Sequence, residues 1–134
     1  MKVLVDTSVW SLALRRNEPG EIVAKLTELI QQSLVVLIGP VRQELLSGIT
    51  DKEVFNNLKS NLRSFDDLPI TTGDYERAAE FFNTCRKNGV QGSHTDFLIC
   101  AAASNNDLLI LTTDQDFRHY AKFLPIRLFD LENV

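Results

Sequence analysis

Four acidic side chains stand at positions in this sequence where carboxylates could act together on a substrate. Asp6 ends the apolar run KVLV, and Asp114 ends the run LLILTT. Glu44 lies one turn into the segment PVRQELLSG, and Asp96 lies in the first turn of HTDFLICAAAS. A fifth acid, Asp116, follows two residues after Asp114. If the fold gathers these acids, they form an all-oxygen site of the kind that suits Mg²⁺ or Mn²⁺.

A bound cation explains how such acids can lie together. Two carboxylates about 4 Å apart repel by about 4 kcal/mol at an effective dielectric of about 20, so a cluster needs a cation or raised pKa values. A divalent metal removes this repulsion, lowers the pKa of a bound water, orients an in-line attack at phosphorus and stabilises the leaving oxygen. The chemistry that this set predicts is hydrolysis of a phosphate ester.

Each acid also has a simpler structural explanation. Carboxylates satisfy free N–H groups at helix N-termini and interact favourably with the helix dipole, so Asp6, Asp96 and Asp114 could be helix caps. Glu44, in mid-helix, could be a solvated surface acid, and so could Asp116. The residues taken singly leave both explanations open.

The placement of these acids depends on a predicted parallel sheet. Continuous apolar runs, typical of strands covered on both faces, occupy residues 2–6, 33–39, 107–114 and 126–130, and residues 65–70 form a short strand or an extended link. Because helical patterns alternate with these runs, we expect a three-layer α/β/α fold with a central, mostly parallel sheet of four to five strands. Such sheets bind ligands beyond the carboxyl ends of their strands, where the acids are expected.

Helical spacing of apolar residues marks the segments between the strands. The predicted helices cover residues 8–16, 19–32, 40–48, 51–64, 72–86, 94–104 and 116–123. Pro19 is expected in the first turn of the second helix, and Gly48 is expected to end the third.

The composition is that of one globular domain. A chain of 134 residues, 44% hydrophobic and 24% charged, fits a single domain spanning residues 1–134. A net charge of −4 argues against a protein that holds nucleic acid through bulk positive charge. We find no apolar run of the roughly 18 residues that a membrane span needs and no secretory signal, so we expect a cytoplasmic protein. Cys85 and Cys100 are expected to be buried thiols.

The segments that carry the acids resemble a known family. VLVDTSVW, PVRQELLSG, GSHTDFLICAAA and LLILTTDQDF look like the acidic motifs of PIN-domain ribonucleases, specifically VapC-type toxins, in order and over nearly the whole chain. The resemblance implies an Mg²⁺- or Mn²⁺-dependent endoribonuclease that leaves 5′ phosphates. It also implies RNA as the substrate, a homodimer, and a heteromeric complex with a VapB-type antitoxin that contacts helices within residues 19–64.

The same resemblance assigns roles to individual residues. Catalysis and metal binding are implied for Asp6, Glu44, Asp96 and Asp114, with Asp116 as a supporting ligand. Small polar side chains near the metal or the acids are implied at Thr7, Ser8 and Thr112 and, more weakly, at Thr113.

Several other polar and aromatic residues have to be weighed against this set. Arg42 and Arg118 lie close to strand ends and are candidates to contact RNA phosphates. His94 has no second histidine at ligand spacing, so we favour a loop or capping role over a general base or a zinc ligand. Trp10 and Phe117 are expected to pack in the interior rather than to stack on bases.

Other functions remain as alternatives. A phosphatase of the haloacid dehalogenase type needs a second aspartate two residues after Asp6, where Ser8 stands. A phosphate-accepting receiver carries its acceptor at the end of a middle strand, whereas the second apolar run here ends in Gly39 and Pro40. A non-catalytic PIN-fold binding module, or another metal-dependent phosphohydrolase, stays open.

Overall fold

A parallel four-stranded sheet forms the centre of the molecule. The computed structural model describes residues 1–15 and 20–130. The strands are β1 (Val3–Val5), β2 (Val35–Val36), β3 (Leu109–Leu111) and β4 (Arg127–Leu128), in the order β2-β1-β3-β4. A single parallel bridge joins Leu37 to Asp67, so the predicted segment 65–70 contributes one paired residue at the β2 edge. The predicted parallel sheet is confirmed.

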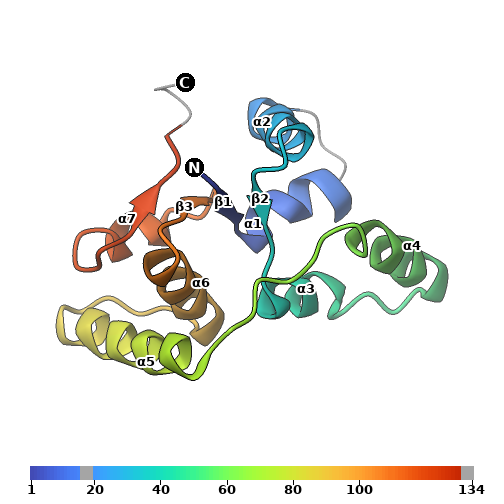
Figure 1. The fold of residues 1–134 in the computed structure, drawn as a ribbon. Coiled ribbons are helices and arrows are strands. Elements are labelled where there is room, and N and C mark those ends of the chain that lie inside the picture. The colour runs from blue at the N-terminus through green and yellow to red at the C-terminus, as the bar shows by residue number, and fades with distance from the viewer. Residues whose placement is uncertain (16–19, 131–134) are drawn as a thin grey trace.

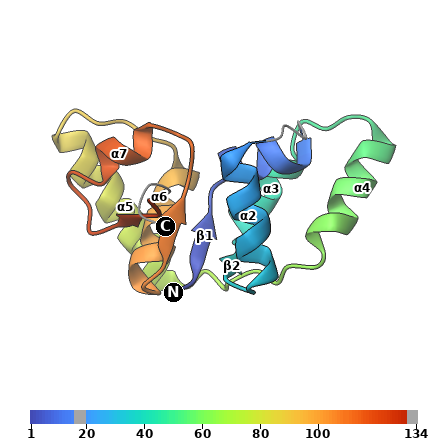
Figure 2. The ribbon, with the colours of Figure 1, turned by 90° about the horizontal axis from the view of Figure 1, so that it is seen from above.

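Helices cover the sheet and complete the three-layer α/β/α fold, which is also confirmed (Figures 1 and 2). They are α1 (Thr7–Trp10), the π-helical turn η1 (Ser11–Arg15), α2 (Glu21–Gln31), α3 (Gly39–Leu46), α4 (Lys52–Leu62), α5 (Thr72–Lys87), α6 (His94–Asn105) and α7 (Asp116–Tyr120). Helices α5, α6 and α7 lie beside β3 and β4, whereas α2, α3 and α4 lie on the β2 side. Among the described residues, these helices are all too short or too polar to cross a membrane.

The helix boundaries differ from prediction where local capping decides them. Arg16 and Pro19 lie outside the described residues, so the predicted proline start of α2 is not tested. The helix predicted from residue 51 begins one residue later, because the Asp51 carboxylate accepts hydrogen bonds from the amides of Glu53 and Val54. Gly48 has a φ of 86°, the left-handed conformation that glycine adopts readily after a helix end, and α3 ends before it as expected.

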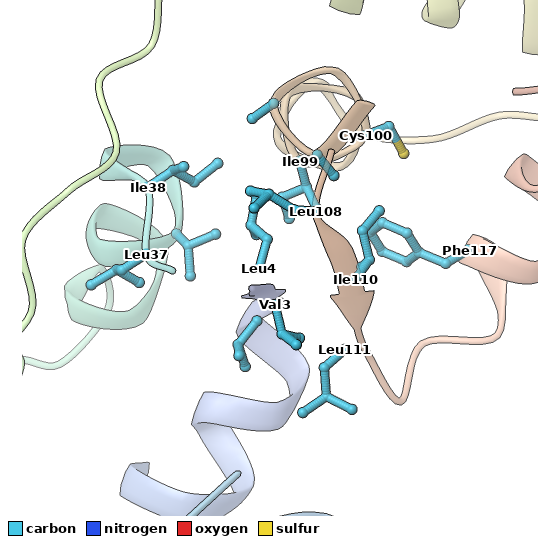
Figure 3. Packing of buried hydrophobic residues seen from close by; sticks show 14 of the residues in the cluster. Val3, Leu4, Leu37, Ile38, Ile99, Cys100, Leu108, Ile110, Leu111 and Phe117 are labelled. Carbon is cyan, nitrogen blue, oxygen red and sulfur yellow. The ribbon is translucent and has the colours of Figure 1, made fainter. Parts of the chain in front are cut away.

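Side chains from both faces of the sheet build the core. Leu4 of β1 and Ile110 of β3 point toward α6, where Ile99 lies, whereas Val3 and Leu111 point to the opposite face (Figure 3). All five residues are at most 1% exposed. This burial on both faces explains why the strand segments read as continuous apolar runs. Cys85 and Cys100 are buried free thiols, as predicted.

A buried acid fixes the start of α5 against α6. Thr71 and Asp74 form a capping box, and Asn105 of α6 donates to Asp74 Oδ1 at 2.7 Å. Burial raises the pKa of the Asp74 carboxyl, but these hydrogen bonds outweigh it and hold the pKa below its ordinary value. Asp74 is therefore a structural acid, remote from the acids considered above.

Arg42 ties α3 to the segment that follows α4. Its guanidinium contacts the Asp67 carboxylate at 3.0 Å and donates to the backbone oxygens of Leu62 and Phe65 at 2.9 and 2.6 Å. Asp67 is the residue bridged to Leu37 at the sheet edge. All three guanidinium nitrogens of Arg42 therefore donate within the fold, and its contact with RNA stays a prediction.

Replacing Arg42 with alanine should lower the free energy of unfolding by about 2–3 kcal/mol, since hydrogen bonds that involve a charged group contribute about 1.5–3 kcal/mol each and act here as one unit. Arg63→Ala, at an exposed position after α4, is the matched control and should change it by less than about 0.5 kcal/mol. Urea unfolding measures both variants. Equal losses for the two would contradict the anchoring role of Arg42.

Candidate active site

Asp6 leaves the end of β1 and is only 5% exposed. Its backbone occupies the cap position of α1, where its carbonyl accepts from the Val9 amide at 3.1 Å, but its side chain makes no capping hydrogen bond. Instead, Oδ2 accepts from the hydroxyls of Ser8 and Thr112, both at 2.8 Å. No described residue donates to Oδ1, so both of these hydrogen bonds engage the same carboxylate oxygen.

Two hydroxyl groups join the carboxyl ends of β1 and β3. Thr112 Oγ1 donates to Asp6 and accepts from the Asp114 amide at 3.0 Å. Ser8 Oγ donates to Asp6, accepts from the Thr113 amide at 3.1 Å and lies 3.3 Å from Thr112 Oγ1. These contacts place Asp6 and Asp114 at fixed positions along the same edge, although more than 100 residues separate them in sequence.

Asp96 lies in the first turn of α6 but does not cap it. Ser93 is the cap, and its hydroxyl accepts from the Asp96 amide at 3.1 Å. The Asp96 carboxylate is held by the Tyr120 hydroxyl, which donates to Oδ2 at 2.6 Å. Burial raises the pKa of the Asp96 carboxyl, and the negative charges of Asp6 and Asp114 raise it further, against the opposing hydrogen bonds from Tyr120 and Ser93. The three acids therefore share one electrostatic environment.

Asp114 precedes the cap position of α7, which Gln115 occupies. Its Oδ1 accepts from the amide of Asp116, the first residue of α7, at 2.9 Å. Asp116 itself is exposed. This hydrogen bond engages only one of the two carboxylate oxygens of Asp114, so it does not prevent the other from binding a cation.

Beside Asp114 lies an open cavity of about 580 Å³ at the carboxyl edge of the sheet. Its polar wall includes Thr112, Asp114 and the exposed Arg118, and residues from the start of α2 and from the segment after β4 line the other side. Arg118 is thus placed where a phosphate next to the acids could reach it.

Glu44 stands apart from the other three acids. It is exposed on α3 and lines a separate hollow of about 280 Å³ with Thr95, the neighbour of Asp96. The structure therefore places Glu44 beside the first turn of α6, but without a hydrogen bond to the other acids.

The remaining polar and aromatic candidates divide between the site and the interior. The Thr7 hydroxyl is buried without a hydrogen-bond partner in the described structure, next to Asp6. His94 is the first residue of α6, where its ring stacks on Phe82 with centroids 5.3 Å apart. Trp10 packs edge-on against Phe65, as expected.

A divalent cation suits the side chains of Asp6, Asp96 and Asp114, which offer carboxylate oxygens. Asp6 Oδ1 and the Thr7 hydroxyl receive no hydrogen bond from the described residues. Across residues 1–15 and 20–130, no three His, Cys, Asp or Glu side chains converge closely enough to form a ready-made metal cage. Mg²⁺ does not need one, because it keeps several waters and binds through one or two carboxylates.

Tyr120 is the residue at this site that the sequence did not reveal. A tyrosine in a short amphipathic helix has the pattern of a core residue, and its ring is indeed fully buried. Only the packing of α7 against α6 brings its hydroxyl to Asp96.

Fold and site together define an α/β/α protein with an acidic centre at the carboxyl edge of a parallel sheet. The model of the PIN domain family matches residues 3–123. The chain therefore belongs to the PIN domain family, as the motifs predicted.

Solved structures share this fold. FitAcB from Neisseria gonorrhoeae matches with a TM-score of 0.77 and 24% identity, over 98% of this chain and 99% of that one. VapBC2 from Rickettsia felis, bound to a promoter DNA fragment, matches with a TM-score of 0.79 and 17% identity, over 96% of this chain and 98% of that one. VapBC-5 from Mycobacterium tuberculosis, of the VapBC family of toxin–antitoxin systems, matches with a TM-score of 0.70 and 15% identity, over 96% of this chain and 98% of that one. A comparison with curated proteins found no match.

Replacing Thr112 with valine should loosen this edge of the sheet. The Asp6 carboxylate loses a donor and the Asp114 amide loses its acceptor, so the free energy of unfolding should fall by about 1–3 kcal/mol. Thr113→Val is the matched control, because Thr113 is exposed and contacts Ser8 through its backbone amide. Urea unfolding of both variants measures the difference; a Thr112→Val protein as stable as Thr113→Val would show that the hydroxyl does not join the strands.

Proposed function

We propose that this chain is a metal-dependent endoribonuclease and the toxin of a VapBC-type toxin–antitoxin pair. The proposal is carried by one observation: the hydroxyls of Ser8 and Thr112 join the Asp6 carboxylate to the Asp114 backbone at one sheet edge, where burial and then the charges of Asp6 and Asp114 raise the pKa of Asp96. Acids held together against repulsion are what a cation site needs. Membership in the PIN family supports the nuclease assignment.

Asp6, Asp96 and Asp114 would hold Mg²⁺ or Mn²⁺, with Glu44 and Asp116 as further ligands reached through water. A divalent ion supplies activation of water and neutralises charge on the scissile phosphate. The chain itself orients the ligands. Ser8 and Thr112 engage Oδ2 of Asp6 and leave Oδ1 to the cation.

The Thr112 hydroxyl also holds the backbone of Asp114 in place, because it accepts a hydrogen bond from the Asp114 amide. Thr7 adds an unpartnered buried hydroxyl beside this set, which could bind a water molecule at the site. Arg118, on the wall of the adjoining cavity, is placed to contact a phosphate of the RNA.

The toxin assignment draws support from the matched structures, whose names are those of FitAcB and VapBC complexes. We infer that this chain likewise binds a VapB-type antitoxin and forms a homodimer. Ile30 of α2 and Val54 of α4 are 37% and 52% exposed, on the helices where the family resemblance puts antitoxin contact. Helix α4 lies at one end of the molecule, away from the sheet (Figure 2).

Cleavage of RNA by the purified chain tests the proposed activity. We expect cleavage with Mg²⁺ or Mn²⁺, none with EDTA, and products that carry 5′ phosphates. Asp6→Asn and Asp96→Asn should each lower the rate by at least about 100-fold, since charge stabilisation by a metal contributes several kcal/mol. Asp66→Asn makes the same change at an exposed acid that was not predicted to belong to the site; it is the matched control and should keep full activity. Cleavage in EDTA, or full activity of a folded Asp96→Asn protein, would contradict the mechanism.

Arg118 is expected to contribute a phosphate contact. In fluorescence anisotropy with labelled single-stranded RNA in EDTA, Arg118→Ala should weaken binding and reduce the slope of log K against log salt by about 0.7, the value for one phosphate contact on a single strand. Arg63→Ala removes an equal charge from an exposed position outside the site and should leave the slope unchanged. Identical slopes for the two variants at low salt would remove Arg118 from the RNA-binding surface.

A further inference from the structure

Tyr120 joins α7 to the first turn of α6 through a single short hydrogen bond. Its side chain is fully buried, and its hydroxyl donates to Asp96 Oδ2 at 2.6 Å. This distance lies in the range of hydrogen bonds from a hydroxyl to a carboxylate, which are about twice as strong as neutral ones. The carboxylate that receives this bond is one of the three acids of the proposed cation site.

The ring of Tyr120 is held on two sides, so its hydroxyl has a defined position. Phe97 lies with its ring centroid 5.0 Å away at an interplanar angle of 47°, and Phe117 packs edge-on at 5.2 Å. Both neighbours are at most 1% exposed. Because core packing fixes the ring, the hydroxyl fixes Asp96 rather than the reverse.

Gly92, in the segment before α6, leaves the space that this hydroxyl occupies. A Cβ at Gly92 would lie 2.3 Å from the Tyr120 hydroxyl oxygen and 2.8 Å from Cζ, well inside contact distance. The backbone of Gly92 is outside the left-handed region, so the close approach alone accounts for glycine here. The missing side chain of Gly92 thus makes room for the hydroxyl of Tyr120, although the two residues are distant in sequence.

We propose that Tyr120 is a positioning residue for the Asp96 carboxylate, and that Gly92 is required for this arrangement. The inference rests on the proposed function, because it takes Asp96 to be a cation ligand. Tyr120 engages Oδ2 from the core side and sets the rotation of the carboxylate, which leaves Oδ1, without a donor among the described residues, to the cation. Hydrogen bonds that orient metal ligands in this way commonly change metal affinity by about 10–100-fold when they are lost.

Tyr120→Phe tests this role, since it removes the hydroxyl and keeps the ring. Mn²⁺ affinity, measured by electron paramagnetic resonance of free Mn²⁺ without RNA, should fall by about 10–100-fold. In RNA cleavage at a fixed Mn²⁺ concentration, kcat should fall while KM for RNA stays within about twofold, because Tyr120 does not contact the substrate. Tyr75→Phe, the same chemical change at a residue 55% exposed on α5, is the matched control and should alter neither value.

Gly92→Ala provides a second variant that keeps the tyrosine. The added methyl group should displace the hydroxyl and reduce Mn²⁺ affinity to a similar extent. In the double variant the two losses should not add, because the bond that each breaks is the same one. Circular dichroism and urea unfolding establish that each variant is folded; should Tyr120→Phe not fold, Gly92→Ala decides.

The outcomes separate this inference from the function on which it rests. Wild-type binding of Mn²⁺ and cleavage of RNA, with equal Mn²⁺ affinity in folded Tyr120→Phe and Gly92→Ala, would overturn the positioning role and leave the proposed function standing. An equal loss in Tyr75→Phe would overturn it too. A wild-type chain that neither binds Mn²⁺ nor cleaves RNA would contradict the proposed function, and the positioning role with it.

Discussion

The repulsion among carboxylates at one edge of the sheet is the constraint on which the rest of this structure depends. Asp6 is buried, and Asp96 has a raised pKa because of burial and of the charges of Asp6 and Asp114. Asp6 is shielded from water, whereas Asp96 and Asp114 are partly exposed. Each is held by neighbouring groups, Asp6 by Ser8 and Thr112 and Asp96 by Tyr120. The fold thereby fixes these acids through one oxygen each and leaves the other oxygen of each without a donor among the described residues.

A short parallel sheet is what allows such distant residues to meet. No strand of the described structure exceeds three residues, yet β1 and β3 pair along their whole length, so the residues that follow them emerge side by side. Helix α6 leads into β3, and its first turn is thereby returned to the same edge. The hydroxyls of Ser8 and Thr112 then convert this proximity into a fixed register.

Much of this arrangement could be predicted from sequence, for a physical reason. Strands buried on both faces read as continuous apolar runs, and acids that follow such runs must lie at the sheet edge. What could not be predicted depends on contacts between helices. The sequence does not show that Arg42 pairs with Asp67, and Tyr120 has the pattern of a core residue until α7 is packed on α6. Glu44 is one turn into its helix, as predicted, but that spacing does not say that it faces Thr95.

Anomalous diffraction from crystals grown with Mn²⁺ tests the central claim most directly, because it locates the cation without relying on activity. We predict a peak at the carboxyl edge of the sheet within about 2–2.5 Å of oxygens of at least one of Asp6, Asp96 and Asp114, with waters completing the coordination. The same crystals of Asp96→Asn should show the peak weakened or lost. Density at full Mn²⁺ saturation that lies elsewhere, or that is unchanged in Asp96→Asn, would contradict the account.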